Sequence, residues 1–579
     1  MPKDAGLKKR LDHRFTKLWT DADTWRAHWA MIAEQQSSRR STALLEKNKR
    51  GGKDDGTRRN TAILNTTPIM AVRTLSSGMM SGITSPSRPW FRLATPDPDK
   101  MEIPSVREWL DVVQRRMHVR FARTNLYTAL PVLYDDLGTL GTSAMMMDDD
   151  DEEMMRFTPL TPGTYVLAAD GQGRISTMMR EVSMTVEQIV DKFGEEYVSH
   201  QIRTAIQKQA WDQEFTIRHA ILPKGKVKHK IQENAPDNAA VNMRWFSVYW
   251  EPGRHQEGEL LKVGGYDRFP VLTPRWYLIG NQTYGRSPGM DCLGDCRQLQ
   301  DMERRKARLT ALMAEPPMKG PPSMENRKSS IAPNEMTYVQ ETQNGKYEPA
   351  YVVDPQGLNF LLQDIAIVEQ RIRTAFYVDL FLMLASTDRR EITAREVDER
   401  HEEKLLQLGP VIERLYDEAL DPLVDFTFKR MFEAGEIPPP PPELEEEDLR
   451  VELISIMAAA QNLVTASSID RLLGVVINVA GAKPDVLDKI DADQLVEEYS
   501  ELLGTPVDIV KDSEDVAQER AARQKAQQAA AAMETADVAA GAAQKASQAT
   551  TPGGTNVLEE LLRQNDQGIN PDTQEAGIF

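Results

Sequence analysis

The sequence predicts an α+β protein that is mainly helical, on three observations. Long segments towards both ends of the chain repeat apolar residues every three or four positions, as amphipathic helices do. A central block, residues 156–263, instead contains short runs that alternate apolar and polar residues, as strands do. The chain has 579 residues, which is long for a single hydrophobic core. We therefore expect two or more core regions.

The N-terminal part is expected to be helical. Residues 7–36 predict one amphipathic helix or a pair of helices. Its apolar positions are Leu11, Phe15, Leu18, Trp19, Trp25, Trp29 and Ile32. The segment 47–60 is rich in Gly, Lys and Arg and predicts an exposed loop, with contact to nucleic acid as the alternative. A further helix is expected at 61–82.

An extended, proline-punctuated stretch follows at residues 84–97, with Trp90 and Phe91 as expected core anchors. Pro104 is a favoured first-turn residue and begins a long helical stretch that is predicted over residues 104–140.

The central block predicts strands with a helix between them. The acidic run Asp148–Glu153 ends the first helices and is expected to be a solvated loop, with cation binding as the alternative. The predicted strands are 156–168, 174–184, 215–222, 244–251 and 259–263. A turn at Asp170–Gly173 lies between the first two, and a helix is expected near 185–210.

A long helix begins after the central block. Ser287 is a good N-cap and Pro288 a good first-turn residue, and the helix is expected to end near Ala314. An irregular insertion rich in Gly, Pro and Ser follows at 316–356. It contains strand candidates at 336–340 and 347–353.

A second long helix is predicted from Leu358 to about Leu384. Its apolar residues recur in alternating steps of three and four, which is the pattern of a seam between two packed helices. These residues are Leu358, Leu361, Ile365, Val368, Ile372 and Ala375. Each of the two helices would be roughly 40 Å long.

The C-terminal part begins with a polar break at 385–390. A third helix is expected from Thr393, whose capping box with Glu396 marks its start, and Gly409-Pro410 should kink it. Pro422 is expected as a second kink.

Prolines 438–442 and the acidic run 443–448 should end this unit. Helical segments are predicted again at 450–503. Beyond about residue 513 the chain is rich in Ala and Gln, which predicts a marginal helix or disorder.

One segment partly matches a phosphate-binding P-loop. Gly280–Ser287 follows an apolar segment and precedes a helix, as that motif requires. Arg286 stands where the motif needs a lysine, and no later strand supplies an obvious magnesium ligand. An ATPase is therefore a minor alternative.

The sequence offers no other catalytic or metal-binding pattern. The eight histidines are scattered, and neither an HExxH nor a GxSxG motif occurs. Cys292 and Cys296 are four residues apart, so they share a helix face and are expected to be free thiols in a reducing compartment. No enzyme, cofactor or metal is predicted. The first residues lack the apolar stretch of a signal peptide, and no apolar run is long enough for a membrane span.

The net charge of −18 allows two kinds of interaction with DNA. The protein could bind DNA through a local basic patch, or DNA could slide past an acidic surface without binding to it. Simple solubility is the third interpretation. The basic cluster on the first long helix, Arg304, Arg305, Lys306 and Arg308, is mixed with Asp301 and Glu303. It predicts salt bridges with neighbouring helices or, alternatively, a positive ring around a channel.

Several segments, in this order, resemble one known family. They are Leu64–Thr67, Arg73–Pro86, Pro89–Phe91, Trp109-Leu110, Asn125–Tyr127, Gly138–Thr142, Tyr284–Pro288, Ile392–Val397, Leu408–Val411 and Ser455–Gln461. The similarity spans about residues 7–465, and the family is that of the head-to-tail connecting, or portal, proteins of short-tailed double-stranded DNA phages.

This resemblance implies a structural subunit of a ring, usually of twelve copies, at one capsid vertex. It implies the following regions: wing 1–286, first stem helix 287–315, clip 316–356, second stem helix 357–384, tunnel loop 385–391, kinked wing helix 392–436, crown 437–512 and an Ala/Gln-rich tail 513–579.

The resemblance also implies partners and site residues. The DNA channel would be lined by Ser386, Thr387, Asp388, Arg389 and Arg390 of the tunnel loop, and more weakly by Arg304, Arg305 and Arg308. The clip would present Lys319, Arg327 and Lys328 to the large terminase subunit and later to tail adaptor proteins.

Further implied partners are double-stranded DNA, held without sequence readout, and the major capsid and scaffold proteins. The protein would be found in the virion, and in the host cytoplasm during assembly. The alternatives are a packaging ATPase or another head component, such as a scaffold or minor capsid protein.

Overall fold

The structure is a computed structural model, in which most of the chain up to residue 453 is described. The described residues are 5–36, 44, 63–101, 103–224, 243–253, 260–316, 318–319, 348–349, 354–386, 408–444, 450–453, 469, 472–476, 494–496, 499 and 513–548. The chain divides into two compact units, residues 1–458 and 459–579, and each is described by itself.

The N-terminal helical prediction is confirmed as a pair. Helix α1 (Ala5–Asp21) is followed by α2 (Asp23–Gln36). Their apolar faces pack against the central sheet, with Phe15 and Ile32 buried. Leu18, Trp19 and Trp25 lie at the margin of this core and are partly buried.

Helix α4 (Thr67–Ile83) and strand β1 (Phe91–Ala94) come next. The two predicted anchors, Trp90 and Phe91, are buried at 1% and 0% exposure. Trp90 stacks on Phe121, and the Phe91 ring lies against His118 in a tilted arrangement. The expected extended stretch with two aromatic anchors is therefore confirmed.

The helical stretch predicted over residues 104–140 is confirmed, and the structure divides it into two helices. The structure has α5 (Pro98–Met101), then α6 (Pro104–Arg123) and α7 (Leu126–Leu140). The break falls at Asn125, whose side-chain amide donates to the carbonyl of Phe157 and accepts from its backbone N–H, at 2.7 and 2.8 Å. This link to a distant strand turns the chain, which local periodicity cannot reveal.

The acidic run is not the predicted loop. Strand β2 (Met145–Asp150) contains three of its aspartates and pairs with β3 (Met154–Pro159), so that only the tip of a hairpin is a turn. The buried residues Met145–Met147 set the strand, and the acidic residues extend it outwards. Strand β9 (Val271–Leu272) pairs with β2 on the other side.

A five-stranded antiparallel sheet forms the rest of the central block, in the order β4-β5-β6-β7-β8. Its strands are β4 (Tyr165–Ala169), β5 (Ile175–Thr185), β6 (Glu214–Pro223), β7 (Trp245–Trp250) and β8 (Lys262–Tyr266). Between β5 and β6 lie α8 (Val186–Phe193), η2 (Glu195–Tyr197) and α9 (His200–Gln207). The predicted first strand, 156–168, is thus divided between β3 and β4.

The two predicted long helices are present, and both are interrupted. The first is α12 (Pro288–Asp291) continued by α13 (Leu293–Ala314). The second is α14 (Pro355–Ala375) continued by α15 (Val378–Ser386). Tyr377 causes the second break, because its φ of 55° is left-handed and no α-helix continues through it.

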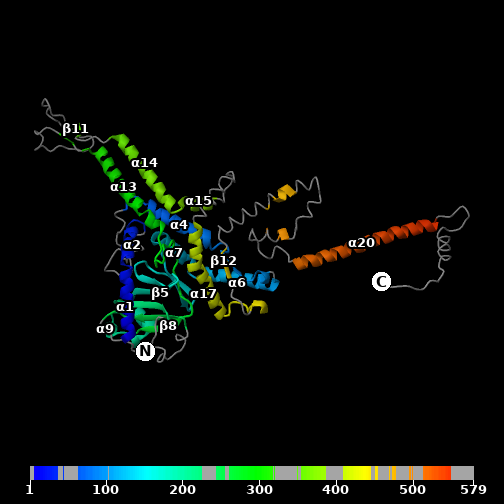
Figure 1. Ribbon diagram of the computed structural model, residues 1–579, viewed down its shortest axis with the longest axis horizontal. Helices are drawn as coiled ribbons and strands as arrows, with labels where there is room; N and C mark the ends of the chain where they lie inside the picture. Colours follow the sequence, from blue (N-terminus) through cyan, green and yellow to red (C-terminus); the bar gives the residue numbers. More distant parts are fainter. Residues whose placement is uncertain are drawn as a thin grey trace. The chain divides into compact units, whose positions relative to one another are not determined.

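Short strands β10 (Met318–Lys319) and β11 (Glu348–Pro349) pair at the outer end of the helix pair. Figure 1 shows α13 and α14 side by side with β11 beyond them. The strand expected at 347–353 is confirmed in part, and the one at 336–340 lies outside the described residues.

The kinked helix is described from residue 408, so its predicted capping box at Thr393 lies outside the described residues. Residues 408–415 are helical, η5 (Tyr416–Leu420) is a π-helical turn, and α17 (Asp421–Glu433) completes the element. The π turn directly precedes Pro422, which cannot donate a backbone hydrogen bond.

After η6 (Pro442–Leu444), residues 450–453 form strand β12 (Arg450–Leu453), which pairs antiparallel with β1. The helical prediction that began at residue 450 is therefore wrong at its start, because β1 offers a free edge to the returning chain. In the second unit, α20 (Ser513–Gln548) is a long helix, one of the two outcomes expected there.

Candidate functional site

Within the described part of the chain, the helix pair α13–α14 contacts the rest of the protein at its inner end. Ile365 and Val368 of α14 are buried, as the predicted seam requires, while Leu358 and Leu361 near the outer end are only half-buried. Asp295 and Arg371 pair across the two helices at 3.3 Å. The outer half of the pair is therefore a projecting arm.

Asn65 ties the two helices to the start of α4. Its side-chain amide donates to Glu303 of α13 at 3.1 Å and to Glu369 of α14 at 2.8 Å. Gln300 accepts the backbone N–H groups of Leu64 and Asn65, at 2.7 and 3.0 Å. This polar network fixes where the arm leaves the body of the protein.

The basic cluster of the first long helix is exposed and only partly paired. Arg304 and Arg305 both pair with Asp301 of the same helix, at 3.4 and 2.9 Å. Lys306 pairs with Glu303. Arg308 is exposed and has no ion-pair partner in the described part of the chain. The expected salt bridges with neighbouring helices are, at these positions, bonds along one helix.

The other predicted site residues are described only in part. Ser386 is the last residue of α15, and Lys319 belongs to β10. Residues 387–390, Arg327 and Lys328 lie outside the described residues. The structure therefore brings the helix cluster together but does not test the loop or clip residues.

Helix α15, which leads to residue 387, is fixed against α4 by a glycine. A Cβ atom added at Gly78 would lie 2.2 Å from Cγ of Phe381, so only glycine lets the two helices approach. Phe381 is 8% exposed. Sequence reasoning missed this contact, although Gly78 lies within one of the segments that resemble the family.

The P-loop match has a packing role instead. The backbone N–H of Gly285 donates to Oγ1 of Thr142 at 2.8 Å, and a Cβ atom there would lie 2.4 Å from the carbonyl oxygen of Gly141. The backbone N–H of Arg286 donates to Tyr277 at 2.7 Å. These amides are already used within the fold, so they do not form a phosphate cradle.

Ser287 caps the following helix as predicted. Its hydroxyl accepts from the N–H of Met290 at 3.1 Å and donates to the carbonyl of Thr139 at 2.7 Å. The predicted free thiols are also confirmed. Cys292 and Cys296 are buried with sulfur atoms 3.8 Å apart, and the Gln36 amide donates to both.

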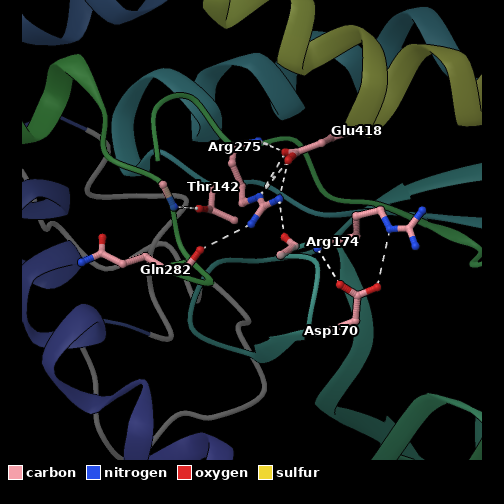
Figure 2. Close-up of polar contacts among 8 residues, drawn as sticks. Thr142, Asp170, Arg174, Arg275, Gln282 and Glu418 are labelled. Atoms are coloured by element: carbon pink, nitrogen blue, oxygen red, sulfur yellow. Dashed lines mark hydrogen bonds and ion pairs between the residues drawn. The ribbon is translucent and has the colours of Figure 1, made fainter. Parts of the chain in front are cut away.

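A largely buried ion pair holds the kinked helix to the central block (Figure 2). The guanidinium of Arg275, which is 4% exposed, donates to both carboxylate oxygens of Glu418 in η5, with Nε distances of 3.0 and 3.1 Å. It also donates to the carbonyls of Gly173 at 2.9 Å and Gln282 at 3.4 Å. One arginine thereby joins three segments that are distant in sequence, which no sequence motif indicates.

Among the described residues, no group of three or more His, Cys, Asp or Glu side chains could hold a metal ion. No described helix is long and apolar enough to cross a membrane. The polar contacts that the structure does contain position segments relative to one another. Together with the projecting helix pair, they give a multi-segment body from which two packed helices extend.

Comparison with known proteins gives the family. The sequence model of the bacteriophage head to tail connecting proteins matches residues 8–510. The chain therefore belongs to this family, the portal proteins that connect phage heads to tails.

Two relatives match nearly full length. The probable portal protein of Bordetella phage BPP-1 is 41% identical over 538 residues, which cover 92% of this chain and 95% of that protein. The portal protein of Salmonella phage epsilon15 is 40% identical over 547 residues, which cover 94% and 96%. A chain from the virion of a native gene transfer agent particle aligns at 10% identity with a TM-score of 0.36, over 80% of this chain and 98% of that one.

Proposed function

We propose that the chain assembles into a closed ring of twelve copies at one capsid vertex, and that double-stranded DNA passes through its centre during packaging and ejection. The observation that carries this proposal is an uncovered apolar face on the projecting arm. Phe360 and Ile367 of α14 are 67% and 52% exposed.

These two residues lie two helical turns apart, on a flank of α14 about 120° around the helix from its seam. Met313 at the end of α13 is 41% exposed as well. An exposed apolar stripe on a soluble protein marks a protein contact, and neighbouring arms in a ring would cover it.

In this ring the regions keep the bounds expected from the sequence: wing 1–286, stem helices 287–315 and 357–384, clip 316–356, tunnel loop 385–391, kinked wing helix 392–436 and crown 437–512. The tail at 513–579 has no proposed role. The clip, with Lys319, Arg327 and Lys328, docks the terminase during packaging and tail proteins afterwards, while the wing meets capsid and scaffold proteins.

The net charge of the chain is consistent with a channel through which DNA passes. Twelve copies with a net charge of −18 each form a strongly acidic ring, which repels DNA phosphates overall. Arg389 and Arg390 in the tunnel loop, with Arg304, Arg305 and Arg308 on the stem, supply local contacts to the DNA backbone without reading its sequence. Assembly takes place in the host cytoplasm and the ring remains in the virion.

The apolar stripe gives the test of assembly. In the variant Phe360→Glu/Ile367→Glu, charges replace the contact between arms, so the fraction of chain in rings should fall at least about tenfold. The control Asn359→Glu places a charge on the same helix outside the stripe and should leave assembly unchanged. Rings that form normally from the double variant would contradict the assignment of this face to the ring contact.

A further inference from the structure

Two oppositely charged surfaces lie on opposite flanks of α17, and we propose that they bind each other between neighbouring copies of the chain. The inference rests on the proposed ring and names a contact within it. One surface is a groove rimmed by arginines, which belongs to α6 and the end of α17. The other is the tip of the β2–β3 hairpin.

The arginine groove has a volume of about 390 Å³. It is lined by Arg115, Arg116, Val119, Arg120, Arg123, Met431 and Glu436. Its floor includes two apolar side chains, Val119, which is 55% exposed, and Met431, which is buried. The surface thus combines positive charge with uncovered apolar area.

The arginines of the groove are only partly neutralised. Arg120 pairs with the carboxylate of Glu436, and Arg115 pairs with Asp111. Arg116 donates to the backbone carbonyl of Glu436, which carries no net charge. Arg123 is exposed and has no ion-pair partner within the described ranges. The groove therefore keeps an excess of positive charge.

The hairpin tip carries three consecutive exposed acids, Asp151, Glu152 and Glu153. The carboxylate of Asp150 accepts the backbone N–H groups of Glu152 and Glu153, at 2.9 and 3.1 Å, so the tip has a defined shape. None of the three exposed acids has an ion-pair partner among the residues that the structure describes.

The two surfaces lie on different sides of α17. On one side, Arg430 pairs with Asp149 of the hairpin at 2.9 Å, and Lys429 pairs with Asp267 at 2.5 Å. On the other, Phe428 and Met431 face α6: the rings of Phe428 and Trp109 are 6.5 Å apart, and Met431 lines the groove. At about 100° per residue, these two sets of positions fall on roughly opposite flanks of the helix.

A closed ring needs this kind of arrangement. Each subunit contacts the next through two different, complementary surfaces on its opposite sides. An acidic tip on one flank and an arginine groove on the other satisfy that requirement with charge complementarity.

Other occupants fit less well. A DNA backbone would use the arginines but not the exposed apolar floor. The chain's own acidic run at 443–448 begins at the far end of α6, because the backbone carbonyl of Glu443 accepts from Lys100, which precedes that helix. It therefore does not start beside its own groove.

The contact can be tested by reversing the charge of each surface, separately and together. The combined variant is informative because every copy in the ring carries both surfaces, so the reversed charges meet again at each contact. The groove variant is Arg116→Glu/Arg123→Glu and the hairpin variant is Asp151→Lys/Glu152→Lys. Each alone should raise the apparent dissociation constant of the ring about tenfold or more, measured by analytical ultracentrifugation at low salt. The four substitutions combined should restore assembly to within about threefold of the unmodified chain. The control Glu195→Lys/Glu196→Lys makes the same charge change on an exposed segment elsewhere and should have no effect.

The outcomes separate this inference from the proposed function. If the unmodified chain forms rings and the combined variant does not regain ring assembly, the proposed contact is wrong and the proposed ring is unaffected. If groove variants form normal rings but enter capsids poorly, the groove binds another head protein, which also overturns the contact. If the unmodified chain forms no ring, the proposed function itself fails.

Discussion

Arg275 and Glu418 form an ion pair that fastens the π-helical turn of the kinked helix to the loop before α12. Arg275 is 4% exposed and the Glu418 side chain 18%, so the pair is largely shielded from water. Removing one partner leaves an uncompensated charge in the interior, which costs more than the pair itself contributes.

Glu418→Ala should therefore lower the free energy of unfolding by about 3 kcal/mol. The double variant Arg275→Met/Glu418→Met should be less destabilised than Glu418→Ala, because it buries no lone charge. Denaturant unfolding of the three proteins checks both statements. A double variant that is less stable than the single one would show that the pair contributes net stability.

The contact between α4 and α15 depends on Gly78. Gly78→Ala should destabilise the protein by about 1–3 kcal/mol, since its new methyl group would collide with the Phe381 ring. Phe381→Ala alone should cost about 3–5 kcal/mol because it leaves a cavity, but in that background Gly78→Ala should cost less than in the unmodified chain, because the collision is gone. Gly294→Ala is the matched control, because nothing lies within 4 Å of its added Cβ atom, and it should be neutral or slightly stabilising.

Stability should depend on pH through His118. Burial beside Trp90 and Phe91 lowers the pKa of this histidine from 6.5 to about 4. The folded chain therefore binds this proton less readily than the unfolded chain does. Its contribution to stability is constant above about pH 6.5 and is lost as the pH falls towards 4, by about 3 kcal/mol in total. His118→Leu should flatten the stability curve in this window, and an unchanged slope would contradict the assignment.

The proposed tunnel loop, residues 385–391, can be tested by measuring the DNA content of heads. Replacing residues 386–390 with a Gly/Ser linker should leave ring assembly intact and reduce the amount of DNA retained in heads. Arg304→Gln/Arg305→Gln/Arg308→Gln should have a smaller effect, because two of these arginines already pair with Asp301. DNA content per head, measured by nuclease protection, is the readout. Full heads at normal yield from the linker variant would show that the loop does not act on DNA.

Local patterns predicted much of the fold. The helices around Trp29 and Ile365, the strands of the five-stranded sheet and the Ser287 cap all follow from spacing and residue type. The predictions were incomplete or wrong where contacts with distant segments determine the local structure. The helical stretch breaks at Asn125, whose side chain forms a hydrogen bond with the backbone of Phe157. Residues 450–453 form a strand because they pair with β1.

The candidate site was predicted less completely. The seam of α14 was predicted from the sequence, whereas the exposed stripe of Phe360 and Ile367 was not and emerged from the structure. The pairing of Arg275 with Glu418 had no local signal, because 143 residues separate the partners. The same is true of the groove on α6, whose floor and rim include residues from α17 and beyond.

The assembly state of the purified full-length chain tests the central claim most directly. Electron microscopy together with a mass measurement should show closed rings with a central hole, and twelve copies of 65.3 kDa give a mass of about 780 kDa. A chain that stays monomeric or dimeric at high concentration, also with DNA or scaffold protein added, would contradict the account.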